Sequence, residues 1–119
     1  MRTTTGRFTP MHELSITESL VAAILERVEG RIQTVTLMVG RLSGVVGESV
    51  RFCFDVCTQG TRLEGAALDI IDIPGRVRCL TCDVELELPD TILLCTCGSA
   101  NVDIVGGQEL RIKNVEVMV

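Results

Sequence analysis

The early part of the chain has apolar residues at the spacing of an α-helix. The stripe consists of residues about four apart, Ile16, Leu20, Ile24 and Val28, with Val21 and Ala23 beside them. Ser15 followed three residues later by Glu18 is a capping box, which predicts a helix start near Leu14. Gly30 predicts the end of the helix. We therefore expect an amphipathic helix of about four turns with one face in the core.

Alternating patterns predict a strand on each side of a second helix. In residues 34–39 every second residue is apolar, which is typical of a strand with one buried face, and Gly40 ends it. A helix is predicted over residues 48–59. Residues 66–73 are predicted to form another strand, which Pro74 stops.

The second predicted helix carries two cysteines on its apolar face. Cys53 and Cys57 are four residues apart and share this face with Val50 and Phe54. Such a pair could hold a metal ion, but cysteines on a core-facing stripe are more often packed as small apolar residues. We expect Cys53 and Cys57 to be packed in the core.

The last part of the chain predicts short strands. Residues 84–88 alternate, and residues 91–94 can return as their partner after a turn. Residues 102–105 are predicted to be extended, and residues 109–119 form the final strand. The apolar parity slips within this last strand, which predicts a bulge near Asn114.

Four of the six cysteines form two close pairs with the spacing C-x2-C-x12-C-x-C: Cys79, Cys82, Cys95 and Cys97. Two pairs on two turns can bring four thiolates to the corners of a tetrahedron, the arrangement that suits Zn²⁺. The second pair has one residue between its cysteines where two are usual. A structural zinc site is the favoured interpretation. Disulfide-bonded or simply buried cysteines are the weaker alternative, because nothing in the sequence indicates an oxidising compartment.

Together these elements predict an α+β fold, with two helices packed on a small three-stranded sheet and an inserted zinc-ribbon-like lobe. We expect residues 1–10 to be a flexible N-terminal extension, residues 11–74 and 100–119 to form the α+β domain, and residues 75–99 to form the zinc-binding lobe. The lobe is too small to bury a sufficient core. Metal binding, worth ~10–16 kcal/mol in small zinc peptides, is expected to supply much of its folding free energy.

Composition narrows the choice of partners. The net charge of -5 argues against nucleic-acid binding, which needs clustered basic residues, and an aromatic content of 3% leaves little to stack on bases. No apolar run is long enough to span a membrane, and residues 1–10 do not resemble a secretory signal. We expect a cytoplasmic protein with reduced thiols.

The single histidine, His12, lies between Met11 and Glu13, directly before the first predicted helix. A lone histidine is usually a surface or packing residue. Met11, however, would supply a free amine if the chain began there. A terminal amine, a backbone amide and an imidazole make a planar, nitrogen-rich set that favours Ni²⁺ or Cu²⁺ over Zn²⁺.

Several motifs in one order resemble the HypA/HybF family, the nickel metallochaperones of [NiFe]-hydrogenase maturation. They are Met11-His12-Glu13-Leu14-Ser15, Glu18-Ser19-Leu20, Gly60-Thr61 with Glu64-Gly65-Ala66, the cysteine pairs ending in Gly98-Ser99, and Glu109-Leu110-Arg111-Ile112. The resemblance runs from Met11 to the C-terminus. It departs from the family in the residues before Met11 and in the shortened turn between Cys95 and Cys97.

The resemblance implies a nickel site at Met11, His12 and Glu13, which makes the α+β domain the nickel-binding domain. It also implies a structural zinc on the four paired cysteines and Ni(II) as cargo. The implied partners are a HypB-type GTPase and the precursor of a hydrogenase large subunit, and a homodimer is an open alternative. Family members usually start at the methionine of the motif. With residues ahead of it, Met11 has no free amine, and nickel would rely on His12 and backbone amides.

The leading hypothesis is a metal-delivery protein and not an enzyme. The only histidine, His12, lies near the N-terminal end, so the rest of the chain offers no histidine base for a serine or cysteine nucleophile. The sequence also has no phosphate-binding glycine loop. The second hypothesis is a zinc-ribbon interaction module in which His12 is incidental. A redox protein using Cys79 and Cys82 as a dithiol is the third.

Overall fold

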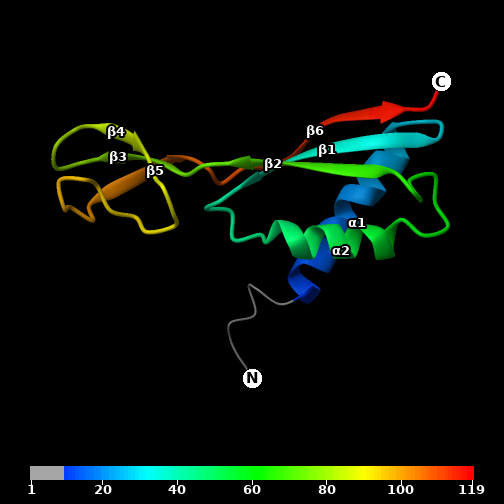
Figure 1. The fold of residues 1–119 in the computed structure, drawn as a ribbon, viewed down its shortest axis with the longest axis horizontal. Helices are drawn as coiled ribbons and strands as arrows, with labels where there is room; N and C mark the ends of the chain where they lie inside the picture. Colours follow the sequence, from blue (N-terminus) through cyan, green and yellow to red (C-terminus); the bar gives the residue numbers. More distant parts are fainter. Residues whose placement is uncertain (1–9) are drawn as a thin grey trace.

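The computed structural model describes the backbone of residues 10–119 and the side chains from residue 13 onward. Its elements are α1 (Pro10–Arg27), β1 (Ile32–Gly40), α2 (Gly47–Cys57), β2 (Ala67–Ile73), β3 (Arg76–Cys79), β4 (Glu85–Glu87), β5 (Val102–Gly106) and β6 (Leu110–Val117). One lobe holds both helices and the sheet β2-β1-β6, and the other holds the sheet β4-β3-β5 (Figure 1). The predicted α+β class with an inserted lobe is confirmed. The extension predicted over residues 1–10 lies outside the described residues apart from Pro10.

Helix α1 begins at Pro10, so the capping box predicted at Ser15 is wrong. Proline suits the first turn of a helix because its fixed φ is helical and its missing N–H would have no partner there. Ser15 is therefore an exposed residue inside the helix. The buried face is also rotated from the predicted stripe and includes Thr17, whose hydroxyl donates to the carbonyl of Glu13 at 2.7 Å.

Strands β1 and β2 are parallel and are joined through α2, with Leu37 of β1 opposite Ile70 of β2. The predicted strand over residues 34–39 is confirmed, and its apolar side chains Val35 and Leu37 are buried against the helices. Figure 1 shows both helices on one side of the sheet. The N-cap residue of α2 makes no side-chain capping bond.

Strand β6 runs antiparallel to β1 and contains the predicted bulge. Thr36 lies opposite Asn114, but the next residue of β1, Leu37, lies opposite Ile112. Lys113 is therefore the extra residue. Because of this bulge, Ile112 and Val115 both pack against the core despite their odd spacing.

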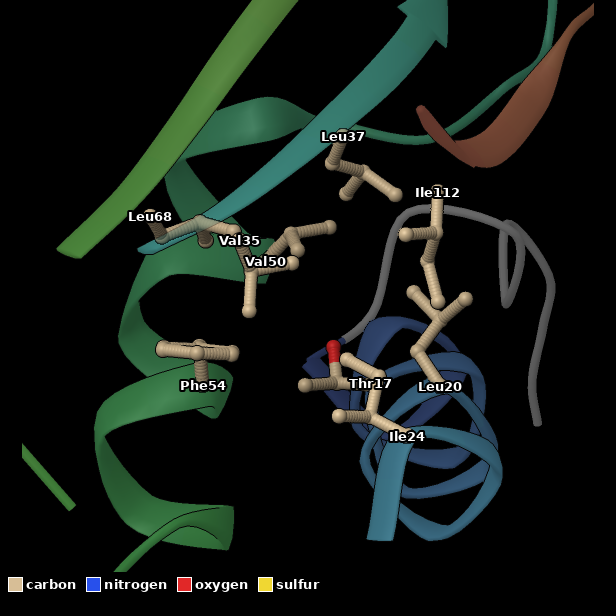
Figure 2. A pocket seen from close by; sticks show the side chains of 9 residues that line it. All are labelled: Thr17, Leu20, Ile24, Val35, Leu37, Val50, Phe54, Leu68 and Ile112. Carbon is tan, nitrogen blue, oxygen red and sulfur yellow. The ribbon is translucent and has the colours of Figure 1, made fainter. Parts of the chain in front are cut away.

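The core of this lobe is close-packed. Nine residues from the helices and the sheet surround a gap of only about 10 Å³, which is shown in Figure 2: Thr17, Leu20, Ile24, Val35, Leu37, Val50, Phe54, Leu68 and Ile112. A space of this size holds at most about one water molecule. This gap is therefore a packing defect and not a ligand site.

In the second lobe, the strand pairing differs from the sequence-based expectation. Strand β4 pairs with β3 and not with residues 91–94, which form no strand. In that segment the amide of Ile92 bonds the Asp90 carboxylate and the amide of Leu94 bonds the Ile92 carbonyl, so local turns replace a ladder. Strand β5 also pairs with β3. This pairing favours grouping residues 102–106 with the lobe, and the domain limits given above remain predictions.

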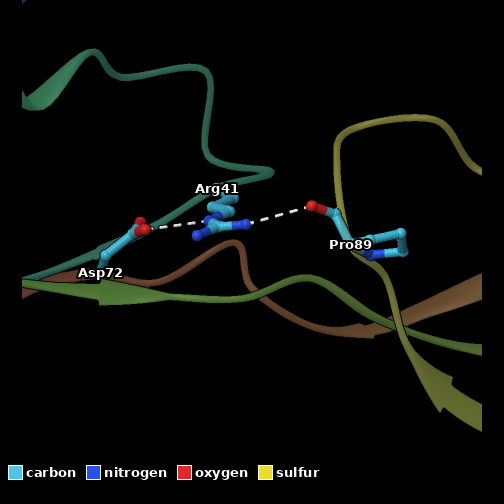
Figure 3. Close-up of polar contacts among 3 residues, drawn as sticks. All are labelled: Arg41, Asp72 and Pro89. Atoms are coloured by element: carbon cyan, nitrogen blue, oxygen red, sulfur yellow. Dashed lines mark hydrogen bonds and ion pairs between the residues drawn. The ribbon is translucent and has the colours of Figure 1, made fainter.

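Glycines let the two lobes meet closely. Gly107 has a φ of 94°, and a Cβ added there would lie 2.5 Å from the Cα of Gly75. A Cβ at Gly40 would collide with the carbonyl oxygen of Gly107. Arg41 spans the same junction, because its side chain bonds Asp72 of β2 at 2.9 Å and the Pro89 carbonyl of the second lobe at 3.3 Å (Figure 3). In the described part of the chain, no helix is both long and apolar enough to cross a membrane.

Candidate metal centre

The structure brings the four paired cysteines together. Cys79 ends β3 and Cys82 follows in a turn, while Cys95 and Cys97 lie on a second turn before β5. All four Sγ atoms lie within 4.8 Å of one another. Among the described residues this is the one group of three or more potential metal-binding side chains so close together.

The sulfur spacing fits a four-thiolate zinc site. The Sγ atoms of Cys79 and Cys97 are 3.8 Å apart, and those of Cys82 and Cys95 are 3.6 Å apart. A tetrahedron with Zn–S bonds of about 2.3 Å has edges of about 3.8 Å, whereas a disulfide needs about 2.05 Å. The cysteines form no disulfide.

Both turns direct a backbone amide at a sulfur. The amide of Cys82 donates to Cys79 Sγ, and the amide of Cys97 donates to Cys95 Sγ, each at 3.5 Å. The second turn does this although it is one residue shorter, because Gly98 takes a φ of 93° and its amide bonds the Cys95 carbonyl at 2.9 Å. The shortened spacing is therefore compatible with the usual amide–sulfur contact.

The four thiols are of two kinds, two whose pKa is lowered and two whose pKa is raised. The Cys82 amide lowers the pKa of Cys79 to about 6 despite burial, and the Cys97 amide likewise lowers the pKa of Cys95. The pKa of Cys82 is raised to about 12, first by its hydrogen bond with the Cys95 sulfur. At Cys97 the Ser99 amide lowers the pKa, but the hydrogen bond with Cys95, together with burial, raises it overall. Metal binding must release the protons that the second cysteine of each pair retains.

Contacts between the turns keep the sulfurs in place. The hydroxyls of Thr81 and Ser99 are 2.8 Å apart and link the two turns directly. The amide of Leu80 bonds the Asn101 carbonyl at 2.9 Å. Cys79 and Cys95 are buried, while Cys82 and Cys97 are exposed. The site therefore has one protected side and one side open to solvent.

The predicted nickel residues lie at the start of α1. The backbone of Met11 and His12 belongs to the first turn, and their side chains lie outside the described part. Glu13 is fully buried, and its Oε2 accepts a hydrogen bond from the Val46 amide at 3.4 Å. Sequence reasoning missed this contact, because 33 residues separate the two and no local motif links them.

Cys53 and Cys57 behave as core residues. Burial raises the pKa of both thiols, and the charges of Glu13 and Glu18 raise the pKa of Cys53 further. Neither belongs to the cluster of potential metal ligands. The expectation that they are packed is confirmed for the buried Cys53, while Cys57 is half-buried against the core.

Residues 11–117 match the family model described as "Hydrogenase/urease nickel incorporation, metallochaperone, hypA". The chain belongs to the HypA family. It is 46% identical over 108 residues to the hydrogenase maturation factor HypA of Nostoc punctiforme, covering 90% of this chain and 96% of that protein. It is 50% identical over 109 residues to the HypA of Trichodesmium erythraeum, with the same coverage.

A solved structure of the HypA family shows the same fold. The solution structure of the Ni metallochaperone HypA from Helicobacter pylori has a TM-score of 0.60 and 24% identity, covering 89% of this chain and 97% of that chain. The predicted resemblance is thus confirmed. Both the Met-His-Glu segment and the four clustered cysteines lie inside the residues that match the HypA family.

Proposed function

We propose that this HypA-family protein binds Ni(II) at the start of α1 and delivers it to the large-subunit precursor of a [NiFe]-hydrogenase. The observation that carries the proposal is the family match over residues 11–117, which contains both the Met-His-Glu segment and the cysteine cluster. We further propose that the protein is not an enzyme and that it acts in the cytoplasm.

The nickel ligands proposed here are the imidazole of His12, adjoining backbone amides and, in a chain that begins at Met11, the Met11 amine. Such nitrogen-rich, planar sets prefer Ni²⁺. The N–H groups of the first helical turn have no intrahelical acceptor, so a ligand at this end competes with few backbone bonds of α1. Glu13 is proposed to lie beside this site, with its carboxylate held against α2.

The cysteine cluster is proposed to hold a structural Zn(II). Its sulfur spacing, its two amide donors and its lowered Cys79 pKa all suit this ion. Zinc would supply fold stability in a lobe whose fully buried apolar residues are few, with Val77 and Leu88 the main ones.

Delivery is proposed to proceed by ligand exchange. A HypB-type GTPase and the precursor are the proposed partners, and their own ligands replace the imidazole of His12 step by step. A site at the end of a helix is reached by a partner more easily than a buried cage. Selective binding and ready release are then compatible.

The test is a nickel titration of zinc-loaded protein beginning at Met11, beside the His12→Ala variant and an exposed control on the same helix, Ser19→Ala. Calorimetry and the d–d absorption of nickel are followed. We expect one nickel per chain in the parent and in Ser19→Ala, and none in His12→Ala. Equal nickel binding by all three proteins would contradict the proposed nickel site.

One observation favours a second candidate, an interaction module shaped by zinc. The second lobe exposes large apolar side chains, among them Leu80, Ile92 and Leu94. Exposed apolar residues that cluster on one lobe are typical of protein-docking surfaces. In this alternative the protein would bind a partner equally well with and without His12.

A further inference from the structure

One face of α2 carries two large apolar side chains that the fold leaves in water. Phe52 is 67% exposed and Val56 is 49% exposed, whereas Phe54, on the other side of the helix, is 5% exposed. Figure 2 shows Phe54 and Val50 among the side chains around the core gap. Because residues four apart lie one above the other on a helix, Phe52 and Val56 form a continuous apolar ridge, here called the α2 ridge.

The charges beside the α2 ridge are negative. Glu48 lies four residues before Phe52 and Asp55 lies three residues after it, so both of these exposed carboxylates border the ridge. The exposed Glu18 of α1 lies near the same helix, because its charge, after burial, raises the pKa of Cys57. Carboxylates from both helices therefore surround the ridge.

The nearby cations do not neutralise these carboxylates. Arg51 is the only basic residue of α2, and its Nη1 donates to the Leu68 carbonyl of β2 at 2.6 Å. Arg27, the only arginine of α1, lies in the last turn of that helix. In the part of the chain that the structure describes, no arginine or lysine forms an ion pair with the three carboxylates beside the ridge. This face therefore combines apolar side chains with uncompensated negative charge.

These features favour one kind of occupant, the apolar face of another helix with lysine or arginine along its margins. A ridge of residues four apart fits the groove between the ridges of a second helix. A strand partner would instead need a free sheet edge. A second copy of this chain, joined symmetrically through the same face, would bring its carboxylates against their own kind. An anionic membrane surface would repel them as well.

We propose that the α2 ridge docks a cationic amphipathic helix of another protein. Phe52 packs between the apolar side chains of that helix, as aromatic residues commonly do at the centre of an interface. Lysine or arginine side chains of the partner pair with Glu48 and Asp55. The ridge is separate from the exposed apolar side chains of the second lobe. The proposal goes beyond nickel delivery and does not depend on it.

The first test titrates zinc-loaded full-length protein into a fluorescent designed peptide. The peptide is a helix of about five turns with leucines on one face and lysines along both margins, and its anisotropy reports binding. We expect saturable binding that Phe52→Ala weakens about tenfold or more. Val56→Ala should weaken it several-fold. The matched control is Val105→Ala, a valine of β5 that is 48% exposed in the second lobe and should leave binding unchanged.

Urea unfolding shows whether these variants remain folded. All three replaced side chains are exposed, so the unfolding midpoints should stay at the parent value. Parental peptide affinity in Phe52→Ala would overturn the proposal. An equal loss of affinity in Val105→Ala and Val56→Ala would overturn it too, because binding would then not depend on the ridge.

The second test reverses the charges. The same peptide with glutamate in place of every lysine should bind the parent at least about fivefold more weakly, because exposed attractions become repulsions. Asp55→Lys should improve the binding of this acidic peptide and weaken that of the basic one. The control is Asp103→Lys, which changes an exposed carboxylate of β5. Equal effects of Asp103→Lys and Asp55→Lys would reflect net charge alone and contradict the assigned pairing.

Sedimentation of the protein alone and flotation with anionic vesicles test the other two occupants. The proposal predicts that the parent sediments as the same species as Phe52→Ala and does not float with the vesicles. Self-association or vesicle binding that Phe52→Ala abolishes, without binding of the basic peptide, would overturn it. None of these measurements uses nickel, so their outcome is independent of the nickel titration.

Discussion

Replacing Glu13 by alanine is expected to destabilise the fold by about 1–3 kcal/mol. The carboxylate is fully buried and serves the start of α2, a helix whose own N-cap, Val46, makes no side-chain capping bond. Leaving a fully buried amide without an acceptor costs about 1–3 kcal/mol, and the Val46 amide is part-buried, so its loss lies toward the lower figure. The charge also interacts favourably with the positive end of α2, worth about 0.3–1 kcal/mol and up to about 2 when buried.

Two features keep the expected loss of stability near the lower end of the sum of these two contributions. The hydrogen bond to Val46 is long, at 3.4 Å, and so is weaker than an ideal one. The variant also no longer buries a carboxylate, which returns part of the desolvation cost. Glu13→Gln keeps an acceptor and the side-chain volume, so it should lose less than Glu13→Ala.

The assay is urea unfolding of zinc-loaded protein followed by circular dichroism, with the free energy taken from the midpoint and slope. The control is Glu18→Ala, an exposed glutamate of the same helix, which should change stability by less than about 0.5 kcal/mol. A Glu13→Ala variant as stable as Glu18→Ala would refute the idea that the carboxylate anchors α1 to α2.

Two further predictions concern the second lobe and its junction. The apparent zinc-binding constant should rise about a hundredfold per pH unit between pH 7 and 8. Zinc binding must remove one proton each from Cys82 and Cys97, because the pKa values of these two thiols are raised. Cys79, with a pKa of about 6, is already ionised in this pH range. Below pH 6 the zinc-binding constant should fall more steeply with pH, because Cys79 is then protonated as well. Chelator competition measures this constant, and a constant that does not change with pH would show that the thiols are ionised before zinc binds. Gly107→Ala should lower the free energy of unfolding by more than about 1 kcal/mol, because its φ is positive and its Cβ would meet the backbone of Gly75. An alanine at Gly44, whose φ is also positive but whose Cβ meets nothing within 4 Å, separates the backbone effect from the clash, and equal losses in the two variants would rule the clash out.

Periodicity along the chain predicted the elements that pack on one core. Val35, Leu37 and Val39 occupy every second position because one face of β1 packs on the helices. This alternation can be recognised from the sequence alone. The bulge in β6 was equally readable, because Ile112 and Val115 can both reach the core only if one residue is extra. The cysteine cluster followed from spacing, because two close pairs on two turns can place four thiolates around one metal ion.

The sequence-based predictions were wrong or incomplete where tertiary contacts determine the local structure. Helix α1 continues back to Pro10 because proline suits its first turn, and this outweighed the capping box at Ser15. Strand β3 was not predicted, because it is only four residues long and two of these are arginines; Arg76 pairs across to Glu85 at 3.0 Å. The contact between Glu13 and Val46 joins two helix starts that only the folded chain brings together.

The central claim is nickel delivery, and its most direct test is transfer. Protein beginning at Met11 is loaded with one equivalent of radioactive nickel and mixed with a hydrogenase large-subunit precursor and a HypB-type GTPase, beside His12→Ala treated in the same way. Nickel in the re-isolated precursor and the resulting hydrogenase activity are then measured. The account predicts transfer from the parent protein above the level given by the same amount of free nickel, and none above that level from His12→Ala. Equal nickel in the precursor from parent, variant and free metal would contradict it.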